Sequence, residues 1–186
     1  VTGVQTCALP IWLIDVGQMR HIAAVKKSDL ISLGVAFVAT LALGIELGIA
    51  VAVVASMLVV FARMSTPHSA VLGHVDGTTS YRNVERFPEA HTVDGIRIVR
   101  IDAALSFANA TNVKKLVVEH AESVLDVPRA LVLDASGIND LDATGAEMLH
   151  ELLVEVADRD VALHLANVKG PVRDVLRNAG IWDEMA

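Results

Sequence analysis

The stretch LVLDASGINDLDATGAEML, Leu131 to Leu149, begins with apolar residues in a row and ends with apolar residues at helical spacing. The run ALVLD (130–134) is apolar without a break up to its final Asp134, as in a central strand covered on both faces. Segment 143–158 places its apolar residues on one helical face. The stretch therefore predicts a strand, a turn and a helix. The turn is rich in Asp, Asn, Gly and Thr, which raises the question of whether it carries out chemistry.

The same alternation continues on both sides of this unit. Further strands are expected at 70–75, 96–102 and 161–166, and further helices at 112–126 and 170–180. The polar stretch 76–95 separates the first two strands. The sequence therefore predicts an α/β fold: a mixed sheet with helices, about four strands and three helices.

Residues 29–62 have a different character, because their only ionisable side chains are Asp29 and Glu46. One continuous helix over this stretch would be about 50 Å long, whereas the hydrocarbon core of a membrane is about 30 Å thick. Two short transmembrane helices, about 29–43 and 46–62, fit better, with the break in LGIELG.

Basic residues flank both ends of this apolar segment, as is typical of cytoplasmic sides. Arg20, Lys26 and Lys27 precede it and Arg63 follows it. The sequence therefore predicts a membrane α-hairpin with both ends in the cytoplasm.

Small residues recur every fourth position along the second helix of the hairpin, at Gly44, Gly48, Ala52 and Ser56. Such a stripe allows close packing, and we expect it to face membrane helices outside this chain. Glu46 has two interpretations: proton or ion coupling, or a carboxylate beside the N-terminus of the second helix, where the dipole favours negative charge. We favour the second.

Charge and motifs exclude several classes of function. The net charge is −7, and it falls on the soluble part, since residues 1–75 carry +1 and residues 76–186 carry −8. This argues against nucleic acid as a partner. Cys7 is the single cysteine, and the histidines have no ligand spacing, so neither a disulfide within the chain nor a metal site is expected. No nucleotide-binding motif, nucleophile elbow or catalytic constellation occurs, so we expect no cofactor and no enzyme.

Both ends of the sequence look artificial. Residues 1–12, VTGVQTCALPIW, resemble translated sequencing-adapter read-through rather than native protein, and the end GIWDEMA stops just after a helix. We expect a cytoplasmic connector at 13–28, a linker at 63–69 and a soluble domain at 70–186, truncated at its C-terminus.

Several segments together resemble the C-terminal end of a SulP-type anion permease, of the sulfate, chloride and bicarbonate transporter family. They are TLALGIELGIAVAVVAS, LGHVDGTTSYRNVERFPEA, IRIVRIDAALSFANA, LVLDASGINDLDATGAEML and ANVKGPVRDVLRNAGI. The resemblance implies that the hairpin corresponds to the last two helices of a larger membrane domain, and that the soluble part is a cytoplasmic STAS domain. It also implies a bacterial inner-membrane, multi-pass transporter, whose anion site would lie in helices upstream of this chain.

The resemblance also gives the polar turn a role. In stand-alone anti-sigma-factor antagonists, a Ser at the position of Thr144 is the phosphoacceptor. The helix N-terminus at Asp142, Thr144 and Gly145 would suit a phosphate, but Asp140 and Asp142 surround it with like charge. The plainer interpretation, which we favour, is a helix start capped by Asp142. On either interpretation the turn is not catalytic.

The helix after this turn presents Glu147, Glu151 and Glu155 outward, one turn apart. This acidic stripe is either a solvated face or a surface for a basic partner. We expect the lipid membrane, upstream helices of the same transporter, a second copy in a homodimer and a cytoplasmic protein as partners. The alternative is a membrane-tethered regulator of the anti-sigma-factor-antagonist class, with the hairpin as a simple anchor.

Overall fold

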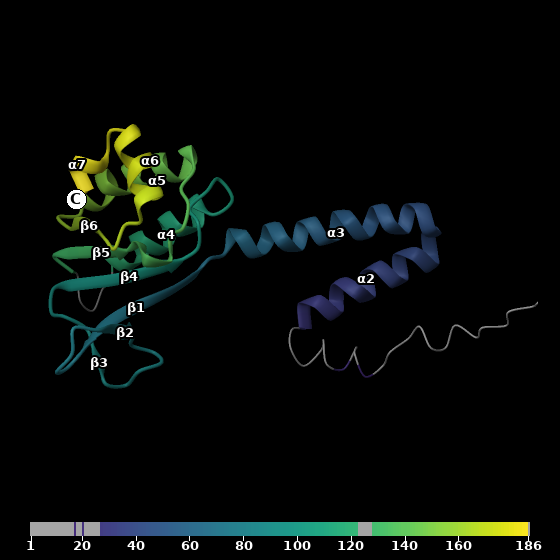
Figure 1. The fold of residues 1–186 in the computed structure, drawn as a ribbon, viewed down its shortest axis with the longest axis horizontal. Coiled ribbons are helices and arrows are strands. Elements are labelled where there is room, and N and C mark those ends of the chain that lie inside the picture. Colours follow the sequence, from purple (N-terminus) through teal and green to yellow (C-terminus); the bar gives the residue numbers. More distant parts are fainter. Residues whose placement is uncertain (1–16, 18–19, 21–26, 123–127, 186) are drawn as a thin grey trace, which may run out of the picture. The chain divides into compact units, whose positions relative to one another are not determined.

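The computed structural model describes residues 27–122 and 128–185, together with Gly17 and Arg20. The expected read-through stretch 1–12 and most of the connector 13–28 lie outside these residues. The chain divides into two compact units, residues 1–60 and 61–186. Each unit has its own architecture (Figure 1).

Two helices form the predicted hairpin. α2 spans Lys27–Leu43 and α3 spans Ile45–Ser65. Gly44 separates them with φ = +81°, a left-handed conformation that favours glycine. The predicted break in LGIELG is therefore confirmed. α3 continues beyond the expected end at 62, because the next residue unsuited to a helix is Pro67, which also restricts the residue before it.

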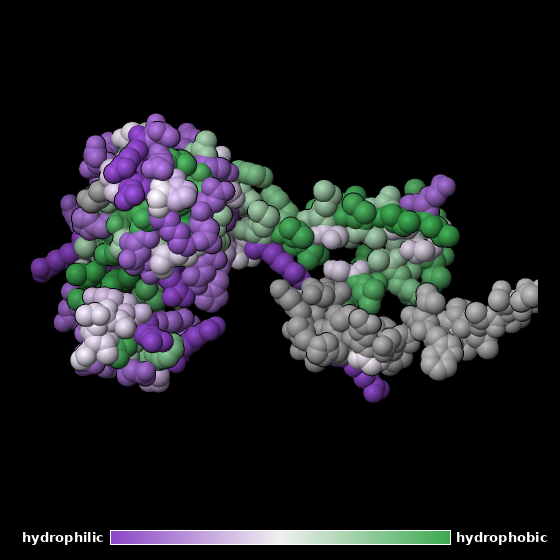
Figure 2. All heavy atoms as spheres, viewed as in Figure 1, coloured by the Kyte–Doolittle hydropathy of each residue, from purple (hydrophilic) through white to green (hydrophobic). Residues whose placement is uncertain are grey.

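The surface of α3 is apolar on all sides. Its mean hydropathy reaches 2.5, and it is long and apolar enough to cross a membrane, whereas the apolar part of α2, Leu30–Leu43, is shorter. Ile45 is 71% exposed and Leu58 is 65% exposed. Figure 2 shows hydrophobic residues gathered over both helices, in contrast to the largely hydrophilic surface of the second unit.

The hairpin closes on itself at Gly48, which is buried. A Cβ atom at this position would lie 2.5 Å from Cα of Thr40 on α2, so only glycine allows this approach. The Thr40 hydroxyl donates to the carbonyl of Ala36 at 2.8 Å and is thereby satisfied within its own helix. Ala52 is half-buried, while Gly44 and Ser56 are exposed. Gly48 of the small-residue stripe therefore packs within the hairpin itself. Contact of the stripe with further helices stays a prediction.

The second unit contains a mixed sheet, as predicted. Its strands are β1 (His68–Val75), β2 (Tyr81–Asn83), β3 (Ala90–His91), β4 (Ile96–Asp102), β5 (Ala130–Asp134) and β6 (Ala162–Ala166). The order is β2-β1-β4-β5-β6, and β3 also pairs with β1. β1 is antiparallel to its neighbours, whereas β4, β5 and β6 are parallel.

Four helices cover one face of this sheet. α4 (Ala110–Ala121) joins β4 to β5, and α5 (Ala143–Ala157) joins β5 to β6. Two right-handed crossovers in the same direction place both helices on the same face. α6 (Gly170–Asn178) and α7 (Trp182–Met185) follow on that side (Figure 1). The fully buried core includes Val99, Ile101, Val113, Val117, Leu131, Leu133, Leu149 and Leu152.

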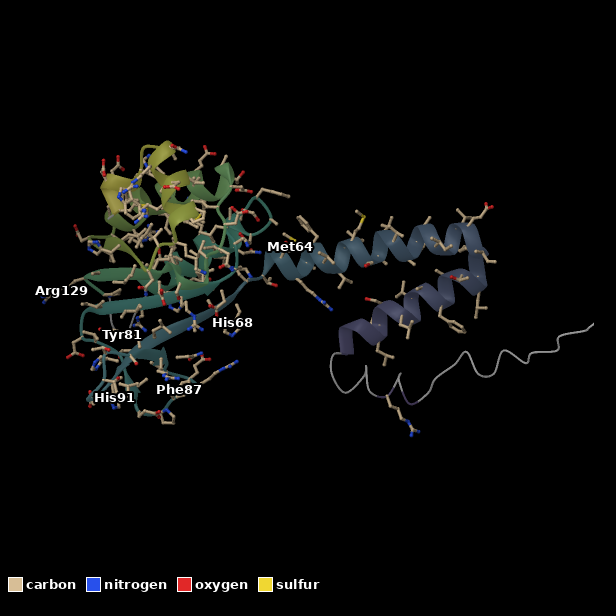
Figure 3. The ribbon with its side chains drawn as sticks, in the orientation of Figure 1. Met64, His68, Tyr81, Phe87, His91 and Arg129 are labelled. Carbon is tan, nitrogen blue, oxygen red and sulfur yellow. The ribbon has the colours of Figure 1, made fainter. Side chains whose placement is uncertain are left out.

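Three details of the fold differ from the sequence prediction. ALVLD is a central strand, but it is fully covered on one face only: Leu131 and Leu133 are buried, whereas Ala130 and Val132 are half-buried. The polar stretch 76–95 contains two further strands, β2 and β3, from which Tyr81 and His91 come, with Phe87 between them (Figure 3). These strands are too short for an alternating pattern of apolar and polar residues to be recognised. They form because they pair with β1. The short helix α7 was also not predicted.

The close approach at Gly48 gives a direct test of the hairpin. We expect Gly48→Ala to lower the free energy of unfolding of the hairpin by about 1–3 kcal/mol, because the added methyl group collides with backbone atoms of α2. The measurement is thermal unfolding of the chain in detergent, followed by circular dichroism. Gly34→Ala is the matched control, since a Cβ at Gly34 would meet nothing within 4 Å. Equal behaviour of the two variants would contradict the packing.

Candidate functional site

The loops after β4 and β5 meet, because the carboxyl ends of adjacent parallel strands lie at the same edge of a sheet. The amide of Leu105 donates to the carbonyl of Asp140 at 3.1 Å, and the amide of Asp142 donates to the carbonyl of Leu105 at 3.1 Å. This pair of bonds forms a short parallel bridge between Leu105 and Leu141. The N-terminal turn of α5 is therefore joined to the loop that leads into α4.

Asp142 uses both of its carboxylate oxygens at this junction. Oδ1 accepts from the amide of Gly145 at 2.7 Å, which caps α5 as predicted. Oδ2 accepts from the amide of Phe107 at 3.0 Å, on the loop before α4. The second bond could not be predicted from local sequence, because 35 positions separate the two residues. Asp142 is thus both a helix cap and a bridge between two loops.

Gly145 has a steric role in the same junction. A Cβ atom there would lie 2.7 Å from the carbonyl oxygen of Leu105 and 2.9 Å from its carbonyl carbon. Any side chain would push the two loops apart. Gly145 therefore permits a close contact between backbones. This contact explains why a glycine stands here, and no bound phosphate is needed to explain it.

Thr144 is exposed in the first turn of α5, between the capping residue and Gly145. Its side chain is accessible to solvent, but the amide of the next residue, Gly145, is already bonded to Asp142. The role of Thr144 as a phosphoacceptor stays a prediction.

Two buried polar residues organise the neighbouring loops and were not singled out from the sequence. Asn109 is 3% exposed; its side chain donates to the carbonyl of Ala104 at 2.8 Å and accepts from the amide of Ser106 at 3.0 Å. Asp134 is 7% exposed and accepts from the amide and hydroxyl of Ser136 and from the Asn167 side chain at 3.0–3.1 Å. A charged residue at the end of an apolar strand is the signal that could have revealed Asp134.

The acidic stripe on α5 is partly neutralised by α4. The ammonium of Lys114 lies 2.9 Å from a carboxylate oxygen of Glu151 and 3.0 Å from one of Glu155. These hydrogen bonds, first that of Glu151, raise the pKa of Lys114, and the bond from Lys114 lowers the pKa of Glu155. Arg159 contacts Glu155 at 3.4 Å and Glu122 at 2.7 Å. Glu147 is exposed and lies outside this network of ion pairs.

Glu46 lies in the first turn of α3, which is the position that the structural interpretation predicted for it. In the described parts of the chain, no group of three or more His, Cys, Asp or Glu side chains is placed to hold a metal ion.

Residues 87–186 match the family of STAS domains. The chain therefore belongs to the STAS domain family.

The relatives of the chain are transporters by name. It is 34% identical over 178 residues to sulfate transporter 4.1, chloroplastic, of Arabidopsis thaliana. The aligned region covers 91% of this chain and 26% of that protein. A probable sulfate transporter of Mycobacterium tuberculosis is 31% identical over 173 residues, covering 93% of this chain and 31% of the relative. The chain thus spans about a quarter to a third of the length of these relatives. The resemblance to the C-terminal region of SulP-type transporters is confirmed, and these relatives imply a membrane location.

A solved structure supports the fold. The murine Solute Carrier 26 family member A9 anion transporter, in the inward-facing state, superposes with a TM-score of 0.78 at 24% identity over 92% of this chain and 28% of that one.

The bridge made by Asp142 can be tested by truncation. We expect Asp142→Ala to lower the free energy of unfolding of the second unit by about 1–3 kcal/mol, because two backbone amides lose their acceptor. Asp142→Asn keeps one acceptor oxygen and should cost less. Chemical denaturation of the chain in detergent measures both. If Asp142→Ala were no less stable than Asp174→Ala, an exposed carboxylate on α6, the bridge would have no energetic role.

His120, half-buried in the last turn of α4, gives a pH test. Burial, and then the positive charge of Arg97, lower its pKa from the ordinary 6.5, while Glu119 opposes this. As the pH falls, His120 therefore takes up a proton in the unfolded chain before it does so in the folded one. The contribution of neutral His120 to the free energy of unfolding is complete above pH 6.5 and is lost as the pH falls below it. We expect His120→Gln to reduce this loss in unfolding experiments between neutral and mildly acidic pH. His164→Gln, at an exposed position on β6, is the control. Identical pH profiles for wild type and His120→Gln would contradict the assignment.

Proposed function

We propose that this chain is the C-terminal part of a secondary active transporter of an inorganic anion, such as sulfate or bicarbonate. The observation that carries the proposal is continuity: an apolar hairpin and a STAS domain follow one another, and relatives named as sulfate transporters match across both. A STAS domain that acted alone as an anti-sigma-factor antagonist would not need the hairpin.

In this proposal α2 and α3 are the last two helices of a multi-pass inner-membrane domain. The helical break at Gly44 and the tight contact at Gly48 support a returning hairpin rather than a single anchor. Basic residues at both ends support a cytoplasmic position for the STAS domain. The anion site would then lie in helices outside this chain, and Glu46 would stabilise the start of α3.

The STAS domain has regulatory and assembly roles in this proposal. Its net negative surface argues against nucleic acid and favours a protein partner with a basic surface. A homodimer of the transporter is part of the proposal through the family resemblance, not through charge. The turn at Asp142, Thr144 and Gly145 is its candidate regulatory element. A phosphate on the exposed Thr144 would lie next to the Asp142 carboxylate and disturb the bridge to the loop before α4.

The proposal predicts anion uptake by the complete reading frame. Cells that lack their own sulfate and bicarbonate uptake systems are expected to regain uptake of one of these labelled anions when they express it.

Thr144→Glu should change the rate of uptake, whereas Thr144→Val should not, if negative charge at this turn regulates transport. Single cysteines at Lys27 and Arg63 are expected to react only with reagents that reach the cytoplasm.

Three outcomes would contradict parts of the proposal separately. A reading frame without further apolar helices would favour the tethered regulator. External labelling at either Lys27 or Arg63 would rule out the hairpin. Equal uptake by the two Thr144 variants would remove the turn as a regulatory element while leaving transport in place.

A further inference from the structure

A groove lies between α5 and the α6–α7 segment, on the outer side of the helical layer. It encloses about 690 Å³. Its floor is formed by Leu141, Ala146 and Ile181, each of which is only 4–6% exposed. The accessible apolar surface comes from the exposed Ala143 and Ala179 and the half-buried Val175. Glu147, His150 and Glu184 line it as well. The groove therefore combines a hydrophobic floor with ionisable side chains around it.

The carboxylates of this groove differ from the rest of the acidic stripe. Glu151 and Glu155 are bonded to Lys114, on the side of α5 that faces α4. Glu147 lies outside that network and lines the groove instead. Glu184 is 52% exposed, and Nδ1 of the His150 ring lies 3.7 Å from its carboxylate. The residues that line the groove all belong to the described part of the chain, and none of them is Lys or Arg.

This combination restricts what can bind. Phosphate groups of nucleic acids or anionic lipids would be repelled by two carboxylates without a compensating Lys or Arg. The groove lies between helices, so an extended peptide would find no strand edge to pair with. An amphipathic helix binds through its side chains alone, inserting apolar residues into such a groove, and its basic residues would meet Glu147 and Glu184.

We propose that the groove between α5 and α6–α7 docks a basic amphipathic helix of a partner protein. An apolar side chain of that helix would pack on Ala143, Val175 and Ala179, above the buried floor. Flanking Lys or Arg side chains would pair with Glu147 and Glu184. This deepens the partner-binding role proposed above and rests on it. Of the three glutamates of the acidic stripe, it leaves only Glu147 available for recognition of a partner.

The test measures binding of a labelled peptide to the whole chain in nanodiscs of phosphatidylcholine. The probe is a short helical peptide with Leu on one face flanked by Lys, and a second peptide carries Glu in place of Lys. Fluorescence anisotropy should show binding of the Lys peptide above its binding to empty nanodiscs, and none of the Glu peptide. Transport is not involved, so a failure here and a failure of the transport proposal are separate results.

Variants locate the binding. The double change Glu147→Gln and Glu184→Gln should weaken binding by about tenfold, as expected for the loss of two surface ion pairs. Ala179→Trp, at an exposed groove residue, should block the groove by bulk without changing charge. Asp174→Asn removes an exposed carboxylate of α6 outside the groove and should leave the affinity unchanged. Thermal unfolding checks that each variant is folded.

Several outcomes would overturn the proposal. They are unchanged affinity in the folded Glu147→Gln, Glu184→Gln variant, equal binding of the Glu peptide, and unchanged binding by folded Ala179→Trp. Self-association of the chain that Ala179→Trp abolishes would assign the groove to a second copy instead.

Discussion

Leu131 and Leu133 on β5 are fully buried beneath the helices, and the arrangement of the second unit depends on this contact. Because the crossovers β4–α4–β5 and β5–α5–β6 run in the same direction, the helices share one face of the sheet, and the carboxyl ends of β4 and β5 lie side by side. The loops that leave these ends must therefore meet. Asp142 and Gly145 are placed where they meet, one supplying an acceptor for two amides and the other allowing close approach.

Much of this could be predicted where the determining interactions are local in sequence. β4 and β5 have the expected bounds, and Asp142 caps α5 as its position before the apolar helix indicates. The break of the hairpin at Gly44 was equally accessible, since two glycines and a charge coincide there.

What could not be predicted depends on contacts between distant residues. Lys114 neutralises Glu151 and Glu155 only because α4 and α5 pack side by side, and the sequence of α5 alone shows an uncompensated acidic stripe. β2 and β3 exist because β1 offers them hydrogen bonds, so a segment with few apolar residues still forms strands. Gly48 faces Thr40 of the same hairpin, a pairing fixed by how the chain reverses at Gly44 rather than by the small-residue spacing.

The same bonds decide how the two candidate regulatory features of α5 would operate. A helix N-terminus that binds phosphate must offer free amides, but the amide of Gly145 is already occupied by a carboxylate that also holds Phe107. A phosphate on Thr144 would therefore act by like-charge repulsion, displacing Asp142 and releasing the loop before α4, rather than by docking into a prepared cradle. The groove beside Glu147 requires no such disruption, because its apolar residues Ala143, Val175 and Ala179 are accessible and its carboxylates are outside the Lys114 network. Phosphorylation would thus loosen the junction between two loops, whereas a basic helix would bind an arrangement that the fold already presents.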